Sequence, residues 1–231
     1  MIGIIGAMPD EVEFLLEKLT EKTEKKYSGT AYVSGKFGGE EIVVAKCGIG
    51  KVNAALCAQT MILLYKPAII LNTGVAGSVS ESAKIGDVVI AGKIVQHDYD
   101  LSPIGFEPGL VQEIGMVHIP CTSAVTRRLE SAAKQFGNFH VGTIATGDQF
   151  ISSADAKTAL AKNFGAIACE MEGAAIAHVC TLAGVDFGIV RTISDNANDS
   201  SPKDFNEFLR EAARKSVEII SGFLTQSPKS T

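Results

Sequence analysis

Cys169-Glu170-Met171-Glu172-Gly173-Ala174-Ala175 follows a short apolar run at residues 165–168, and Arg191-Thr192-Ile193-Ser194-Asp195 follows another at 187–190. Such short apolar runs are typical of buried strands. An open α/β sheet binds its ligand beyond the carboxyl ends of its strands, so acids placed there are candidate site residues. A third acid, Glu11, follows the apolar run 2–5 across the loop 6–9. Three acids without a basic cluster predict acid–base chemistry on a ligand that carries no phosphate.

Bulk composition limits the classes of protein that fit. The chain has 231 residues, of which 46% are hydrophobic and 20% charged, enough for a large core in one α/β domain spanning 1–231. A net charge of −5 argues against a nucleic-acid or membrane-surface binder. No apolar run approaches the roughly 18 residues that span a bilayer. The chain starts with a strand rather than a signal peptide, and its five scattered cysteines fit reduced thiols. We therefore expect a cytoplasmic protein.

Alternating apolar runs and turn residues predict strands interleaved with helices. The predicted strands are 2–5, 31–37, 42–47, 68–71, 88–95, 139–146, 166–169 and 186–192. The predicted helices are 9–19, 51–65, 122–136, 153–163, 171–183 and 204–224. Residues 97–120 are rich in Pro and Gly and read as a long excursion, which in a compact domain is usually functional. Neither an internal repeat nor a linker interrupts this pattern.

Each of these features also has an alternative without function. Glu170 or Glu172 can favour the positive end of the following helix, and Asp195 can be a turn residue. The segment GIIG at residues 3–6 lacks the full dinucleotide fingerprint. The four histidines show no metal-ligand spacing, so we expect neither metal nor cofactor. Cys169 fits a buried small side chain better than a nucleophile.

Six motifs occur in one order along the chain. They are IIGAMPDE at 4–11, GIGKVNA at 48–54, NTGVAG at 72–77, TGDQFI at 146–151, EME at 170–172 and RTISD at 191–195. Together they resemble the 5'-methylthioadenosine/S-adenosylhomocysteine nucleosidases of the nucleoside phosphorylase superfamily, over residues 2 to 224. The resemblance implies an α/β fold, a three-layer α/β/α sandwich around a mixed, partly barrelled central sheet, in a homodimer. It also implies hydrolysis of the N-glycosidic bond of methylthioadenosine, S-adenosylhomocysteine and 5'-deoxyadenosine, in methionine salvage and the activated methyl cycle.

The resemblance also assigns roles at the glycosidic bond. Asp195, with Ser194 beside it, would protonate the leaving adenine at N7, and Glu11 would orient the attacking water. Glu172 would bind the ribose hydroxyls, where its charge favours a cationic transition state. Asp195 would then have a raised pKa and Glu11 a lower one. Further ligand contacts are implied for Met171 on the sugar, Phe150 on adenine, and the backbone of Ile151 and Gly77 on the purine.

The 5' end of the ligand would be bound by apolar side chains. Met8, Ile49 and Phe205 match an alkylthio pocket. The loop 97–120 would complete the partner subunit's site with Leu101, Ile104 and Phe106. The chain departs from the family pattern at Val75, where many members have serine, at Phe106, where many have tyrosine, and at Pro9 within an acidic run.

Three other functions remain open from the sequence. A purine nucleoside phosphorylase shares the EME and SD elements but needs arginines for phosphate, and the first arginine here is Arg127. Lys46 and Lys51 leave that alternative open. A non-catalytic nucleoside-binding protein would be expected to lose the acids Glu11, Glu172 and Asp195. A hydrolase of a futalosine-type nucleoside fits the same residues.

Overall fold

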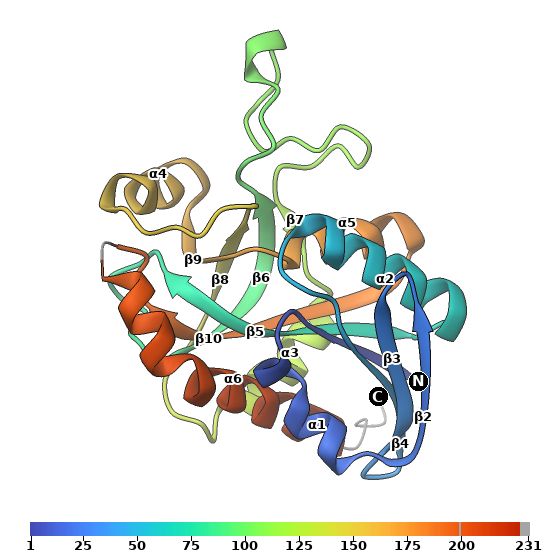
Figure 1. The fold of residues 1–231 in the computed structure, drawn as a ribbon. Coiled ribbons are helices and arrows are strands. Elements are labelled where there is room, and N and C mark those ends of the chain that lie inside the picture. The colour runs from blue at the N-terminus through green and yellow to red at the C-terminus, as the bar shows by residue number, and fades with distance from the viewer. Residues whose placement is uncertain (199, 227–231) are drawn as a thin grey trace.

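The computed structural model describes residues 1–198 and 200–226 (Figure 1). The strands are β1 (Ile2–Gly6), β2 (Thr20–Tyr27), β3 (Thr30–Phe37), β4 (Glu40–Lys46), β5 (Ile69–Ser78), β6 (Val88–Gln96), β7 (Ile119–Pro120), β8 (Phe139–Thr146), β9 (Ala166–Glu170) and β10 (Asp186–Asp195). The helices are α1 (Glu13–Lys18), α2 (Lys51–Tyr65), α3 (Ser123–Ala133), α4 (Ala154–Phe164), α5 (Gly173–Ala183) and α6 (Ser201–Thr225). Two short 3-10 helices, η1 (Pro9–Glu11) and η2 (Ser102–Ile104), complete the set. None of the helices in the described residues is long and apolar enough to cross a membrane.

A single mixed sheet organises the molecule. Its strand order is β10-β6-β8-β9-β5-β1-β4-β3-β2, and β10 also pairs with β5. That extra pairing closes β10, β6, β8, β9 and β5 into a barrel, from which β1, β4, β3 and β2 extend as an open sheet. Parallel pairs such as β1–β5 and β5–β10 occur beside antiparallel pairs such as β5–β9 and β6–β10. The predicted mixed, partly barrelled sheet is confirmed.

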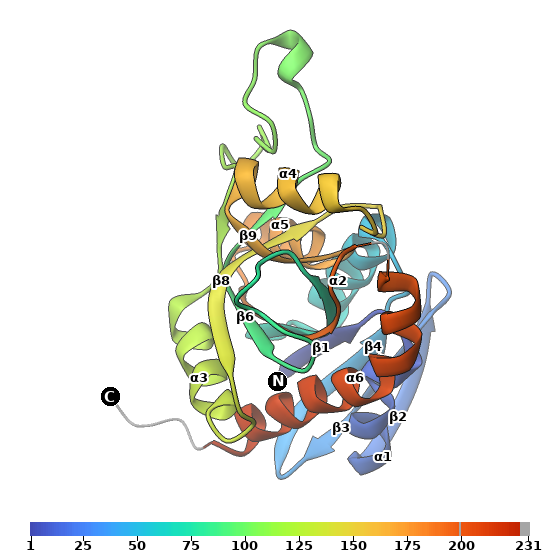
Figure 2. The ribbon, with the colours of Figure 1, turned by 90° about the vertical axis from the view of Figure 1, so that its left-hand side faces the viewer.

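Helices cover both faces of this sheet (Figures 1 and 2). α2 and α5 pack against each other on one face, while α3 and α1 pack against α6 on the other. α4 contacts β8 and β9 near the barrel. Each face has its own apolar core: Ile5 and Met61 of α2 belong to one, and Leu71 and Phe223 of α6 belong to the other. The predicted three-layer α/β/α arrangement is therefore confirmed.

At the N-terminal end, the structure breaks one predicted helix and adds one strand that was not predicted. The predicted helix 9–19 is interrupted at Val12, where the 3-10 helix η1 gives way to α1. The Glu11 carboxylate turns back onto the N–H groups of Ala7 and Met8, which accounts for this tight turn. Strand β2 was not predicted because its sequence, TEKTEKKY, is exposed throughout and has no apolar face.

Strands β5 and β10 are longer than their apolar runs. The segment 72–78, expected to follow a strand, is the second half of β5, and Asp195 is the last residue of β10. These halves pair with each other, as Arg191 with Gly74 and Thr192 with Val75. Their polar residues are buried because the barrel surrounds them, so they lack a continuous apolar pattern. β10 and β5 thereby carry Asp195 and Gly77 side by side.

The excursion 97–120 protrudes from the body of the molecule (Figure 1). It contains the 3-10 helix η2 and ends in β7, which pairs with β6. Ile104 at its tip is 70% exposed. Apolar side chains on the excursion are therefore exposed and are not covered by the rest of the described chain.

Candidate active site

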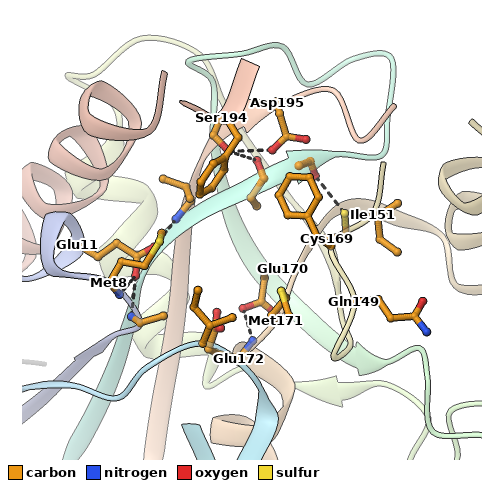
Figure 3. A pocket seen from close by; sticks show the side chains of 17 residues that line it. Met8, Glu11, Gln149, Ile151, Cys169, Glu170, Met171, Glu172, Ser194 and Asp195 are labelled. Carbon is orange, nitrogen blue, oxygen red and sulfur yellow. Dashed lines mark hydrogen bonds between the residues drawn. The ribbon is translucent and has the colours of Figure 1, made fainter. Parts of the chain in front are cut away.

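A cavity of about 580 Å³, counting its open mouth, lies where the carboxyl end of β10 meets the loops after β1 and β8 (Figure 3). This size is typical of small-molecule sites. It is lined by Ala7, Met8, Glu11, Ile49, Val75, Ala76, Gly77, Gln149, Phe150, Ile151, Cys169, Glu170, Met171, Glu172, Ser194, Asp195 and Phe205. The cavity brings together residues from seven segments of the chain.

Glu11 is held at one side of the cavity by three backbone N–H groups. Its Oε2 accepts from Ala7 N at 2.6 Å and Met8 N at 3.0 Å, and its Oε1 accepts from Val75 N at 3.1 Å. A side chain at Gly74 would place a Cβ 2.5 Å from Oε1, so this approach requires glycine. Burial raises the pKa of Glu11, although the Arg191 charge and these three N–H groups oppose the rise. The expected lower pKa of Glu11 is therefore not what the site produces, because the carboxyl is buried.

Ser194 and Asp195 face the cavity from the end of β10 (Figure 3). The Ser194 hydroxyl donates to Asp195 Oδ2 at 2.9 Å, and Ala197 N donates to Asp195 Oδ1 at 2.9 Å. Asp195 is 2% exposed. A Cβ at Gly77 would lie 2.9 Å from Asp195 Oδ1, so glycine is needed here too. The carboxyl is thus held by a hydroxyl and an amide, and it packs against strand β5 where Gly77 has no side chain.

Glu172 directs its carboxyl into the cavity from the N-terminal end of α5. Its Oε1 accepts from Gly50 N at 2.9 Å, across a large sequence separation. Burial and the nearby charge of Glu170 raise the pKa of Glu172, whereas the Arg191 charge lowers it. The alternative that Glu172 caps α5 does not describe its side chain, which makes no capping hydrogen bond.

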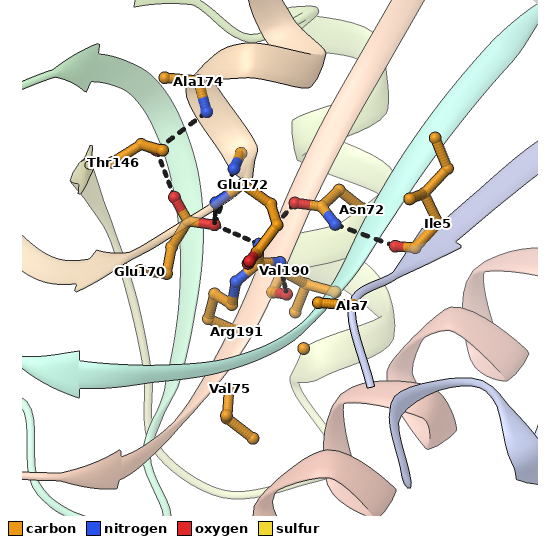
Figure 4. Close-up of polar contacts among 12 residues, drawn as sticks. Ile5, Ala7, Asn72, Val75, Thr146, Glu170, Glu172, Ala174, Val190 and Arg191 are labelled. Carbon is orange, nitrogen blue, oxygen red and sulfur yellow. Dashed lines mark hydrogen bonds and ion pairs between the residues drawn. The ribbon is translucent and has the colours of Figure 1, made fainter. Parts of the chain in front are cut away.

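Glu170 does act at the start of α5 (Figure 4). Its Oε2 accepts from Glu172 N at 3.1 Å and Gly173 N at 2.7 Å, and it forms an ion pair with Arg191. Thr146 donates its hydroxyl to the other carboxylate oxygen. The alternative of a helix-capping acid therefore applies to Glu170, whose carboxylate lies at the cavity wall.

The apolar part of the cavity lies between Met8, Phe205 and the 148–151 loop. Phe150 and Phe205 meet edge to face with ring centroids 5.6 Å apart. Val75 packs with Met8 and Phe205 in a small cluster with α6, so its side chain extends this apolar wall. Phe150 is 47% exposed, which leaves its ring free to receive a flat ligand.

Every predicted site residue except Leu101, Ile104 and Phe106 lines the cavity. Those three belong to the protruding excursion 97–120 and are not brought to the cavity of their own chain (Figure 1). The prediction missed lining residues that have no chemical signature in sequence, namely Ala7, Ala76 and Gln149. Glu170 and Cys169 were noticed but not assigned to the site. Burial raises the pKa of the Cys169 thiol well above its usual range, so it stays neutral and is no nucleophile.

The chemistry available in the cavity is that of carboxylic acids. Glu11, Glu172 and Asp195 face it from three sides, while none of the lining residues is Lys or Arg. Arg191 is buried, and its ion pair among the described residues is with Glu170 alone. No group of three or more His, Cys, Asp or Glu side chains in the described residues is arranged to hold a metal ion. Such a site can donate a proton, polarise water and stabilise a cation.

A barrel-centred α/β fold with an acidic cavity at the ends of β5 and β10 defines a class of nucleoside-processing enzymes. The family model of the phosphorylase superfamily matches residues 1–225. The 5'-methylthioadenosine/S-adenosylhomocysteine nucleosidase of Shewanella halifaxensis is 38% identical over 228 residues, 97% of this chain and 99% of the relative. The chain therefore belongs to the phosphorylase superfamily, among its 5'-methylthioadenosine/S-adenosylhomocysteine nucleosidases.

Solved structures agree with this placement. The nucleosidase of Neisseria meningitidis, solved with methylthio-immucillin-A, superimposes with a TM-score of 0.93 at 31% identity, covering 96% of this chain and 97% of the other. The futalosine hydrolase of Helicobacter pylori superimposes equally well, with a TM-score of 0.93 at 36% identity and 96% coverage of both chains. The family thus includes hydrolases of more than one nucleoside on this fold.

Proposed function

We propose that this protein hydrolyses the N-glycosidic bond of 5'-methylthioadenosine and S-adenosylhomocysteine, releasing adenine and the 5-thio-substituted ribose. The observation that carries the proposal is the set of three carboxyl groups, Glu11, Glu172 and Asp195, in a cavity with an apolar wall. The nearly full-length match to nucleosidases of that name supports the choice of substrate. No cofactor is needed for this reaction.

The reaction divides the acids by role. Asp195 donates its proton to N7 of adenine as the bond from the anomeric carbon to N9 breaks and its electron pair moves into the purine. Glu11 takes a proton from the water that attacks the anomeric carbon. Glu172 binds ribose hydroxyls, and its negative charge stabilises the cationic sugar of the transition state. Its only donor among the described residues is Gly50 N, so its remaining lone pairs are free to accept from those hydroxyls.

The remaining lining residues supply the shape of the site. Phe150 stacks on adenine, the Ile151 backbone and Gly77 contact the purine, and Met171 packs on the sugar. Met8, Ile49 and Phe205 enclose the 5'-alkylthio group. Val75 adds to that wall through its contacts with Met8 and Phe205.

Water is favoured over phosphate as the acceptor by the charge of the cavity. Phosphate would enter a space lined by acidic side chains and by no Lys or Arg. Lys51 is engaged with Asp98 at 2.6 Å, and Arg191 with Glu170. Neither cation is free to bind an oxyanion. Hydrolysis, rather than phosphorolysis, is therefore the chemistry that the site supports.

The functional unit that we propose is a cytoplasmic homodimer. Large apolar side chains are exposed on α2, where Val52 and Leu63 are 78% and 65% exposed, on α5, where Leu182 is 63% exposed, and on the excursion, where Ile104 is 70% exposed. Such patches mark interaction surfaces in soluble proteins. In the dimer, Leu101, Ile104 and Phe106 wall the 5' end of the partner subunit's site.

One assay tests the reaction. Pure protein is incubated with methylthioadenosine, S-adenosylhomocysteine or futalosine, each with and without phosphate, and the products are separated by mass. We expect adenine and a free thioribose from the first two nucleosides, independent of phosphate. A sugar 1-phosphate would show a phosphorylase, turnover confined to futalosine would show the other hydrolase, and tight binding without turnover would show a binding protein.

A further inference from the structure

Glu170 is the carboxylate of the cavity wall to which the reaction assigns no chemical step. Its side chain is 2% exposed, yet its two oxygens receive four donors: the Thr146 hydroxyl, the N–H groups of Glu172 and Gly173, and the Arg191 guanidinium. The two oxygens of a carboxylate offer about four lone-pair sites, so this one side chain can engage all four donors at once. The four donors come from β8, the start of α5 and β10, which are the elements that carry the proposed ligand-binding residues.

Arg191 is correspondingly committed to Glu170. Its Nη2 also donates to Asn72 Oδ1 at 2.5 Å, and its Nη1 donates to the Val190 carbonyl at 3.1 Å (Figure 4). Asn72 is itself fixed, because its amide donates to the Ile5 carbonyl at 2.9 Å. Arg191 forms an ion pair with neither Glu172 nor Glu11 in the described part of the chain, although its charge acts on both. The guanidinium is thus held among three carboxyl groups and engages one.

We infer that Glu170 is a positioning residue for the proposed reaction: it retains the Arg191 guanidinium and the first N–H groups of α5, and so keeps the Glu172 carboxyl free of an ion pair and directed at the ribose site. The expected effect on ribose binding rests on the proposed function. The positioning of Arg191 and of the start of α5 rests on the contacts of Glu170 alone. Without this anchor, the nearest carboxyl groups left for Arg191 are those of the catalytic site. Glu172 paired with a guanidinium would be a poorer acceptor for ribose hydroxyls, since its lone pairs would already be engaged.

Glu170→Gln tests this anchor while nearly keeping the side chain's shape. The amide oxygen can still accept from Arg191 and α5, and the amide nitrogen can donate to Thr146, but the negative charge is lost. Removing a like charge beside Glu172 and releasing the charge of Arg191 both favour ionised Glu172. We therefore expect the pKa of Glu172 to fall by at least about one unit, since charges at this range shift a carboxyl by about 1–3 units.

The measurement is a carbon-13 NMR titration of the glutamate side-chain carboxyl in the ligand-free protein, with Glu172→Gln used to assign the resonance. The matched control is Glu218→Gln, which removes the same charge from a surface ion pair with Arg214 on α6. It should leave the Glu172 titration unchanged. An unchanged titration in folded Glu170→Gln would overturn the inference, whether or not the protein hydrolyses any nucleoside.

Two further measurements separate positioning from folding. Glu170→Asp keeps the charge but shortens the side chain, so that it can no longer reach Arg191 and α5 together. We expect the pKa of Glu172 to fall in this variant too, because Arg191 is released. The aspartate variant therefore still tests the inference if the glutamine variant does not fold. With methylthioadenosine as substrate, the acidic limb of kcat/KM against pH should move to lower pH in both variants, and KM should rise at least about tenfold. A uniform loss of kcat with an unmoved limb would mean that Glu170 only supports the fold.

Discussion

At the scale of single residues, the site consists of carboxyl groups whose surroundings give them different tasks. Asp195 is held by a hydroxyl and one amide, Glu11 by three amides, and Glu172 by a single amide. Each hydrogen bond from backbone stabilises the charged form, while burial opposes it. The three acids can therefore act as proton donor, water ligand and sugar ligand in one cavity.

Asp195→Asn should nearly abolish turnover while the fold persists. The amide has the same shape but cannot donate a proton of comparable acidity to adenine, and general acid catalysis contributes about 100- to 10,000-fold. Adenine release is the assay, with circular dichroism to check the fold. Adenine release at close to the rate of the native protein would remove Asp195 from the role of acid.

Glu11→Gln should be equally inactive but should still bind the nucleoside, because the role that we propose for this residue concerns the attacking water and not the ligand's base. Its carboxyl oxygens receive N–H donors from Ala7, Met8 and Val75, so an amide also disturbs that turn. Calorimetric titration with methylthioadenosine measures the binding. Loss of binding together with loss of the fold would make Glu11 a structural residue of η1.

Glu172→Gln should stabilise the ligand-free protein at alkaline pH. A carboxyl whose folded pKa is raised contributes stability below its unfolded pKa, near 4.3, and that contribution is lost as pH rises through the folded pKa. The glutamine variant escapes this loss. A gain on the order of 1 kcal/mol raises Tm by about 2–4 °C in a protein of this size. Melting at pH 8.5 should show the gain, melting at pH 4.5 should not, and a constant difference at both would contradict this reasoning.

At the scale of elements, the sequence predicted most of the helices and strands. It missed strand segments that have no continuous or alternating apolar pattern. Helix 51–65 was predicted with the bounds of α2, because an uninterrupted apolar helix lies between two clear turn signals. β2 was missed because an exposed edge strand has no apolar face. The second half of β5 was missed as a strand because Gly74, Ala76 and Gly77 serve the cavity and the barrel rather than a face of an ordinary sheet.

The acids of the site could be predicted from sequence, but their partners and their burial could not. Carboxylates at or just beyond strand ends, such as Asp195 and Glu172, can be found from sequence because ligand sites occur there. The partnership of Glu170 with Arg191 could not, since helix α5 and the loops beside it separate the two strands that carry these residues. The pKa of Glu11 was also beyond the sequence, because it depends on how completely the fold buries the carboxyl.

Gly74→Ala tests how closely β5 must approach the catalytic base. The new Cβ would lie 2.5 Å from Glu11 Oε1, so Glu11 has to leave its three N–H donors. We expect kcat/KM to fall at least about a hundredfold, as misplacing a catalytic group by about 1 Å does. Gly222→Ala on α6 is the control, because its nearest contact is an ordinary 3.4 Å and alanine favours the helix. Equal activity of the two variants would show that the Glu11 geometry is not critical.

At the scale of the whole molecule, the proposed dimer concerns the protruding excursion 97–120, which lies apart from the cavity of its own chain (Figure 1). Met8, Ile49 and Phe205 line the cavity, where we propose that they bind the 5' group, while the excursion 97–120 protrudes with Ile104 and Phe106 exposed (Figure 1). Exposed apolar residues on a protruding loop require another surface to cover them. In the dimer that we propose, a second copy of the chain would cover the excursion and gain a wall for its site.

Replacing Ile104 and Phe106 with serine should therefore weaken the binding of methylthioadenosine more than the binding of adenine. Only the nucleoside would reach the wall that the partner supplies in the proposed dimer. Losing a buried large apolar side chain removes about 1.5–3 kcal/mol, or at least about tenfold in affinity. Binding is measured in the Asp195→Asn background, where turnover does not interfere, and oligomeric state by analytical ultracentrifugation. Val141→Thr serves as the control, because Val141 is also an exposed apolar residue, at 46% exposure, but lies outside the excursion. It should change neither the binding affinities nor the oligomeric state. A fully active monomer, or equal losses for adenine and the nucleoside, would show that the excursion walls no site, because a shared wall must act on the 5' end of the ligand alone.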